Sequence, residues 1–281
     1  MDELAAKRVL LDFEIILLLA LVLGAGFFAI RRKIRPPENR PIPDYDGYDL
    51  ILMFFPALLF LLNPVLEVLM AGAVKEDGTD HLSSEAGPWG MLVNIAYFFF
   101  VGVMTYGILE WIRNRRVSEL FGLKRLGLAP IVLYTVVGGF ASLLICAWGV
   151  GTLSQGFLEK IFTDLSAQET VEALQSSDSR IQLALSVVMA CIAAPFVEEI
   201  LFRGYMYGAL KRATNPVFSM VIIGGLFAVV HGNLPALLPL WVFSILLTCA
   251  YEWTRCLWVP IGMHAFFNAA NIILMLDPGG S

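Results

Sequence analysis

Residues 9–30 of this chain, VLLDFEIILLLALVLGAGFFAI, decide its fold class. The hydrocarbon core of a bilayer is about 30 Å thick, and a helix needs about 20 mostly apolar residues to cross it. This stretch is long enough, and the basic residues Arg31, Arg32 and Lys33 follow it. In a secretory signal peptide the basic residues come first and the apolar core is shorter. We therefore expect residues 9–30 to be retained as a first membrane span.

The composition of the whole chain indicates more than one such span. Hydrophobic residues make up 58% of the 281 residues and charged residues 15%, whereas soluble domains are about 45–50% apolar and about 25% charged. The formal net charge of -5 argues against a nucleic-acid partner. We predict an all-α, polytopic integral membrane protein in contact with membrane lipid, located in the plasma (inner) membrane if the cell is bacterial.

Seven further apolar blocks bring the expected total to about eight transmembrane helices. They lie at residues 50–74, 89–111, 128–152, 181–202, 217–231, 236–251 and 256–275. The connections between the blocks alternate in charge, and 14 of the 19 Lys and Arg residues fall on one side. Because basic loops stay in the cytoplasm, this asymmetry predicts that both termini lie outside.

The chain divides at residue 127. Residues 1–127 hold the first three predicted helices with their cytoplasmic linkers, one of which runs from Arg35 to Pro43, and residues 128–281 hold helices four to eight. The acidic connection at 153–180 carries apolar residues at helical spacing, so we expect a helix that lies at the membrane interface. The sequence shows no internal repeat, which disfavours a transporter built from two duplicated halves.

Charged side chains inside membrane spans are costly and therefore mark candidate sites. Glu198, Glu199 and Arg203 lie near the end of the fifth block. Glu199 and Arg203 are four residues apart, so one face of a helix would carry both, and we expect them to form an ion pair. Glu198 points about 100° away around the helix. It would be the free carboxylate that a general base requires.

Two histidines lie in the sixth and eighth spans. His231 ends the sixth block, four residues after Phe227, and His264 lies in the eighth block, four residues before Asn268. The Asn268 amide is a neutral donor of the kind that stabilises an oxyanion. The spacing alone leaves two interpretations open, namely a catalytic cluster or a set of polar side chains that hydrogen-bond between packed helices.

These residues fall into three short motifs in a fixed order. The motifs are Glu198-Glu199-Ile200-Leu201-Phe202-Arg203, then Phe227-Ala228-Val229-Val230-His231, then His264-Ala265-Phe266-Phe267-Asn268. The set resembles the CAAX-processing and bacteriocin-processing (CPBP) family of intramembrane proteases, which includes the type II CAAX prenyl endopeptidases. The likeness covers about residues 181–275, which would be the catalytic core, and it extends to the segment from Leu120 to Arg125 ahead of that core.

The resemblance implies an intramembrane endopeptidase that acts on a membrane-bound or lipidated peptide or protein. Glu198 would activate the attacking water with help from His231. His264 and Asn268 would stabilise the oxyanion, and the expected ion pair would support the site. These roles agree with the needs of peptide hydrolysis, which requires a base for water and donors for the tetrahedral oxyanion.

A metal ion is a second possibility for the same residues. Glu198, His231 and His264 would suit a zinc ion with one open position. The short-spaced His-Glu-x-x-His motif is absent, however. The family is described both as metalloproteases and as glutamate-dependent proteases. We prefer a metal-free, glutamate-dependent mechanism and leave zinc open.

An alternative function is a catalytically inactive membrane scaffold or regulator of the same family, in which the polar cluster serves packing alone. The presence of every motif side chain favours the enzyme, because an inactive relative could lose Glu198 or His231 and keep its fold. The sequence does not identify the substrate.

Overall fold

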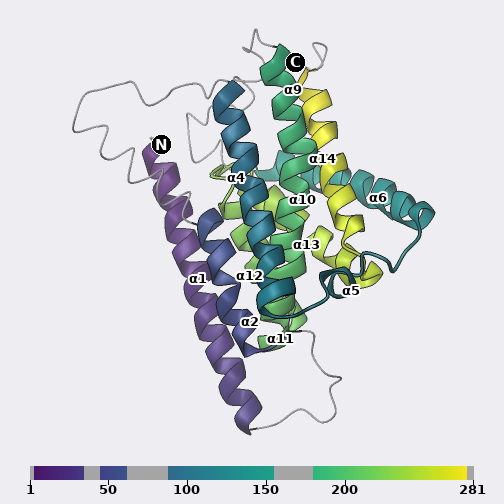
Figure 1. Cartoon of the computed structure of the whole chain (residues 1–281). Helices are drawn as coiled ribbons and strands as arrows, with labels where there is room; N and C mark the ends of the chain where they lie inside the picture. The colour runs from purple at the N-terminus through teal and green to yellow at the C-terminus, as the bar shows by residue number, and fades with distance from the viewer. Residues whose placement is uncertain (1–2, 35–44, 62–87, 155–179, 277–281) are drawn as a thin grey trace.

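The computed structural model describes residues 3–34, 45–61, 88–154 and 180–276 (Figure 1). Within these ranges the chain is helical and contains no β-strand. The predicted linker from Arg35 to Pro43 lies outside the described residues, as does nearly all of the predicted interfacial helix at 153–180. The second predicted span, 50–74, is described only as far as residue 61.

Apolar helices in the described ranges match the predicted spans. Those long and apolar enough to cross a membrane are Ala6–Ile30, Leu92–Ile112, Leu128–Ser154, Arg180–Ala213 and Leu237–Thr254. Shorter apolar helices are Gly47–Leu61, Pro216–Val229 and Trp258–Leu274. The prediction of an all-α, multi-pass integral membrane protein is therefore confirmed, whereas the number of eight spans and the outside location of both termini stay predictions.

The first elements of the chain are α1 (Glu3–Ile34), α2 (Gly47–Leu52), α4 (Pro88–Gly107), the π-helical η1 (Ile108–Ile112) and α5 (Val117–Leu120). Helix α1, purple in Figure 1, packs along α12 (Pro216–Val229). Leu17 lies against Gly225, and Phe218 lies against Gly24. Glycine at these positions lets the two helices approach closely.

A single helix from Arg180 to Ala213 forms the centre of the bundle. Its consecutive parts are α9 (Arg180–Val188), η3 (Met189–Ala193), α10 (Ala194–Glu199), η4 (Ile200–Tyr207) and α11 (Gly208–Ala213), of which η3 and η4 are π-helical. This helix lies between α4 and α14 (Trp258–Leu276), as Figure 1 shows. It continues past the predicted end at residue 202 because Tyr205, Met206 and Leu210 are also buried.

The helices that follow have local sequence signals at their ends. The Asn215 side chain accepts the Phe218 N–H and caps α12, and Pro216 occupies the first turn of that helix. Past the end of α12, Gly232 has a φ of 65°, which glycine adopts at little cost. Helix α13 (Leu237–Thr254) is followed by its C-cap Arg255, whose backbone is left-handed.

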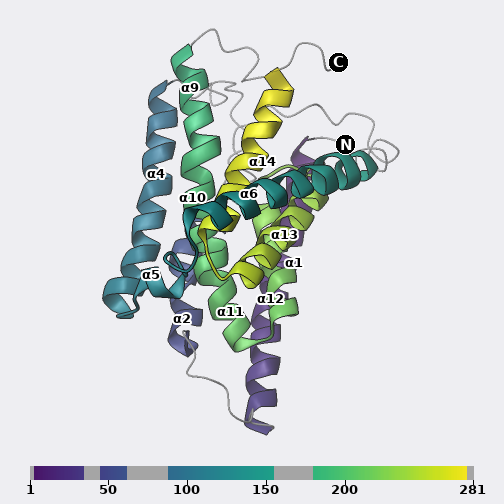
Figure 2. The ribbon, with the colours of Figure 1, turned by 90° about the vertical axis from the view of Figure 1, so that its right-hand side faces the viewer.

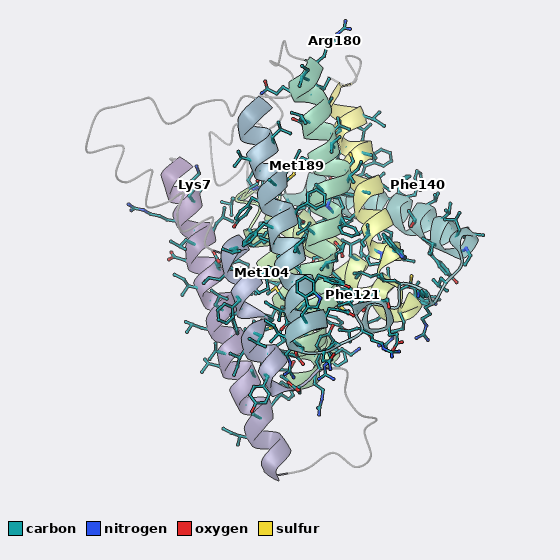
Figure 3. All side chains as sticks on the ribbon, in the orientation of Figure 1. Lys7, Met104, Phe121, Phe140, Arg180 and Met189 are labelled. Carbon is teal, nitrogen blue, oxygen red and sulfur yellow. The ribbon has the colours of Figure 1, made fainter. Side chains whose placement is uncertain are left out.

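The long apolar helix formed by α6 (Leu128–Ser142) and η2 (Leu143–Gly151) crosses α14 obliquely (Figure 2). Gly138 and Gly139 of α6 lie under the Met263 and Phe266 side chains of α14, which lets the helices pack closely. The opposite face is exposed, and Phe140 projects from it (Figure 3). An exposed apolar face of this kind is expected where a helix contacts lipid rather than water.

Candidate active site

Glu199 and Arg203 form the predicted ion pair at the centre of the bundle. Arg203 Nη1 lies 2.9 Å from Glu199 Oε1, and both side chains are 0% exposed. The two residues lie at the junction of α10 and η4. Because burial of an isolated charge without its partner costs several kcal/mol, each residue requires the other in this place.

Arg203 also connects this helix to two others. Its Nη2 donates to Ser244 Oγ at 2.7 Å and to the Ser244 carbonyl oxygen at 3.2 Å, both on α13. Its Cζ lies 4.5 Å from the centre of the Phe227 ring on α12, which is a cation–π contact. The sequence pattern did not identify Ser244. A single serine in an apolar helix is too common to signal such a contact.

His264 of α14 lies between the two glutamates. Its Nδ1 is 2.9 Å from Glu199 Oε1, and its Nε2 is 4.0 Å from Glu198 Oε2. The imidazole makes edge-to-face contacts with the Phe227 and Phe243 rings, whose centres are 5.6 Å and 5.4 Å from its own. A buried ring packed against two other rings keeps one orientation, which a catalytic histidine needs.

The hydrogen bonds constrain where protons lie in this cluster. Ionised Glu199 accepts from Arg203, so the His264 Nδ1 that faces the same oxygen donates its hydrogen. The His264 Nε2 atom faces Glu198 Oε2, which is buried and has no hydrogen-bond partner in the structure. This oxygen of Glu198 is therefore not used to hold the helices together.

The described contacts of His231 are with Phe227, so a direct contact with Glu198 stays a prediction. Its Nδ1 lies 2.7 Å from the Phe227 carbonyl oxygen. Since a carbonyl only accepts, Nδ1 carries the hydrogen and Nε2 is left free. The His231 ring centre is 4.8 Å from that of Phe227, so the Phe227 ring touches both histidines. His231 is exposed, unlike His264.

Asn268 lies one turn along α14 from His264, as predicted, and makes a contact that the spacing did not indicate. Its Nδ2 donates to the Ala190 carbonyl oxygen of η3 at 2.8 Å. One amide hydrogen is thus used to join α14 to the π-helical segment, and the other remains available. Asn268 therefore contributes to helix packing whatever its part in chemistry.

The depth of Glu198 in the bundle follows from the length of its helix. Had the helix ended at the predicted residue 202, Glu198 would lie near one membrane surface and His231 near the other. Instead Glu198 lies near the middle of the 34-residue helix from Arg180 to Ala213. Helix α12 ends at Val229, and the Phe227 ring before this end meets both histidines.

The metal hypothesis can be tested against the same geometry. In the described part of the chain, no three His, Cys, Asp or Glu side chains lie together in a way that could hold a metal ion. Glu198, His231 and His264 therefore do not form a ligand set in this arrangement. Assignment as a metalloprotease is not supported, and the mechanism proposed for the site uses protein side chains alone.

Comparisons with known proteins identify a family for this chain. The family model described as Type II CAAX prenyl endopeptidase Rce1-like matches residues 180–270. The chain is 34% identical over 231 residues to a Bacillus subtilis (strain 168) protein named "Putative membrane peptidase YdiL", which covers 81% of this chain and 86% of that protein. It is 33% identical over 95 residues to "Uncharacterized protein YyaK" of the same organism, 31% of each chain. No solved structure matches.

Proposed function

We propose that this chain, which belongs to the Rce1-like type II CAAX prenyl endopeptidase family, is an intramembrane endopeptidase that uses Glu198 as its general base. Its substrate would be a membrane-bound or lipidated peptide or protein. The observation that carries the proposal is the buried contact of 4.0 Å between Glu198 Oε2 and His264 Nε2. In a bacterium the enzyme would act in the plasma (inner) membrane.

Glu198 would take a proton from water as the water oxygen attacks the peptide carbonyl carbon. The carbon–nitrogen bond would then break, and Glu198 would return the proton to the leaving nitrogen. The free Nε2 of His231 would help to hold the attacking water. Atoms and charges balance, because one water is consumed and one amine and one carboxyl group are released.

The oxyanion would be stabilised by His264 and Asn268. His264 would donate from Nε2 as an imidazolium that keeps both ring protons throughout the reaction, with Nδ1–H on Glu199, and Asn268 has one amide hydrogen that is not used by Ala190. Donors fixed before the reaction stabilise the oxyanion without reorganisation. Glu199 and Arg203 would contribute by holding the His264 ring in place through Nδ1.

The alternative is an inactive scaffold or regulator, for which the same contacts would serve only to pack the helices together. The observation that favours it is the use of Asn268 and Arg203 in contacts between helices. The two functions differ in one respect that can be measured, namely whether Glu198 is required for the release of new protein termini.

Mass spectrometry of membrane-protein termini tests the proposal. Wild type and Glu198→Gln would be expressed at matched levels in a host that lacks the gene. Glutamine keeps the size of the side chain and cannot act as a base, so we expect new termini with wild type and none with the variant. Glu252→Gln is the matched control, because Glu252 pairs with Lys211 and Arg255 outside the cluster. Identical termini in wild type and a folded Glu198→Gln would support the scaffold.

A further inference from the structure

The short helix α5 and the turn after it place two buried side chains against the bundle. Helix α5 is Val117–Leu120, and a turn follows it as far as Arg125. Val117 is 3% exposed and Phe121 is 1% exposed. In Figure 3 Phe121 lies among the helices of the bundle. This segment contains the stretch from Leu120 to Arg125 that precedes the catalytic core, and the mechanism proposed above gives it no role.

On one side, the Phe121 ring packs against the helix that carries Glu198 and Glu199. A Cβ atom added at Gly204 would lie 2.8 Å from Phe121 Cζ, so the ring rests on bare backbone of η4. Gly204 directly follows Arg203 in the chain. The absence of a side chain at Gly204 is what admits the ring to this position.

On the other side, the same residue is bonded to the start of the helix that carries His264. The Phe121 carbonyl oxygen accepts the Leu257 N–H at 3.0 Å, one residue before α14 begins. The next residue, Gly122, has a φ of 63°, and a Cβ there would lie 1.9 Å from the Arg255 carbonyl oxygen. The turn between α13 and α14 therefore lies directly on the backbone of this segment.

We infer that Phe121 is a positioning residue that sets the separation between Glu198 and His264. The inference rests on the proposed function, because it concerns the geometry of the same site. Phe121 belongs to neither helix. Its ring packs on Gly204 of the central helix, and its carbonyl oxygen accepts the N–H of Leu257, the residue directly before α14. Leu257 is seven residues from His264, about 10 Å along a helix. Because the helix is rigid, a displacement of Leu257 also displaces the His264 imidazole.

Removal of the Phe121 ring should lower kcat and leave KM nearly unchanged. Phe121→Ala leaves a void that neighbouring helices fill only in part, so the two helices can shift relative to one another. A misplacement of about 1 Å at a catalytic group can cost a hundredfold in rate. We expect kcat to fall by about tenfold to a hundredfold, with KM changed by less than about twofold because no substrate contact is lost. Phe121→Leu refills most of the void and should restore most of kcat.

An experiment that needs no substrate tests the geometry itself. The chain has 3 histidines, so labelling of histidine with ¹⁵N gives ring signals that His→Gln variants can assign by NMR in the full-length protein. The His264 Nδ1 signal reports its hydrogen bond to Glu199. We expect this signal and its pH titration to change in Phe121→Ala and to return in Phe121→Leu. The control is Leu21→Ala, which also empties a buried position, in α1, and should leave the His264 signals unchanged.

The double variant Phe121→Ala/Gly204→Ala tests the contact separately. Gly204→Ala alone should lower the melting temperature, because its methyl group meets the Phe121 ring, and this loss should shrink when the ring is absent. Additive losses would show that the contact is not made. Unchanged His264 signals and kcat in a destabilised Phe121→Ala would overturn the positioning role and leave the proposed function intact. If wild type shows no Glu198-dependent cleavage, the proposed function fails, and the positioning role for catalysis fails with it.

Discussion

Glu199 and Glu14 are both buried carboxyl groups in membrane-crossing helices, but their surroundings differ completely. Glu199 is 0% exposed and Glu14 is 1% exposed. One oxygen of Glu199 accepts from Arg203 and from His264. Neither oxygen of Glu14 has a hydrogen-bond partner in the structure. Burial alone therefore does not show what a membrane carboxyl group does, and the atoms around it decide.

The difference begins in the local sequence. Glu199 has Arg203 four residues away on its own helix, whereas Glu14 has Leu10 and Leu18 at the corresponding positions. Across the helix interface, α1 packs on α12, whose residues 216–229 include no charged side chain. A polar group left without a partner in such surroundings reduces stability. Glu14 takes no part in the mechanism proposed above.

Among the variants suggested by this comparison, we expect the largest loss of stability when the Arg203 side chain is removed. Arg203→Met leaves Glu199 as a buried charge with only His264 as a partner, and breaking a buried ion pair in this way costs about 3–5 kcal/mol. Thermal unfolding in detergent micelles would measure this loss. The double variant Glu199→Gln/Arg203→Met removes both charges and should lose less than the single variants combined.

A matched control for this prediction is Ser244→Ala. It removes one hydrogen bond of Arg203 and keeps the ion pair, so a cost of about 1–3 kcal/mol is expected. If Arg203→Met costs no more than Ser244→Ala, the ion pair does not stabilise the bundle and the comparison fails.

The second prediction concerns Glu14, whose replacement we expect to leave the stability unchanged or to increase it. Glu14→Leu replaces an unpartnered carboxyl group with an apolar side chain of similar size. The variant loses no hydrogen bond and no longer buries a carboxyl group without a partner. It should therefore be as stable as wild type or more stable by about 1 kcal/mol. Its melting temperature relative to that of Glu14→Gln, which keeps a polar group, is the measurement. A clear loss of stability in Glu14→Leu would reveal a partner for this carboxyl group.

The smallest change in stability is expected when the charge of Asp46 is removed. Asp46 is a partly exposed carboxylate outside the membrane-spanning helices. Burial raises its pKa, but the backbone N–H groups of Tyr48 and Asp49 and the Arg113 guanidinium outweigh this effect and hold the pKa below its usual value. Asp46 also caps α2 by accepting these N–H groups. Its charge stabilises the fold above about pH 4 and the contribution is lost as the pH falls below this value.

Asp46→Asn keeps the cap and removes the charge. We expect a loss of about 1 kcal/mol or less at neutral pH, because a partly exposed ion pair is screened by solvent. The difference in melting temperature between wild type and the variant should shrink below about pH 4. A difference that stays constant from pH 7 to about pH 3 would contradict a lowered pKa at Asp46.

The fold class and helix positions were largely predictable from the sequence, because apolar block length depends on bilayer thickness and not on neighbouring helices. The exception was the end of the central helix. The charged residue Arg203 interrupts the apolar pattern after residue 202, yet the helix continues to Ala213. Contacts with Ser244 and Phe227 on other helices bury the Arg203 side chain, which the local sequence does not reveal.

The spacing of four residues predicted the ion pair between Glu199 and Arg203. The hydrogen bond from His231 to the Phe227 carbonyl oxygen has the same spacing but was not predicted. The contact of His264 with Glu199 joins residues 65 positions apart. Its geometry depends on how far each helix is shifted along its neighbour.

The sequence by itself determined that this is a multi-pass α-helical membrane protein with the charged motif residues of a membrane peptidase family, because hydropathy and helical spacing are local properties. Only the tertiary structure decided that His264 lies between Glu198 and Glu199, that Ser244 completes the hydrogen bonds of Arg203, and that Phe121 touches both helices of the site. These contacts depend on the tilt and depth of whole helices. Side-chain packing across many residues sets both quantities, so no short stretch of sequence encodes them.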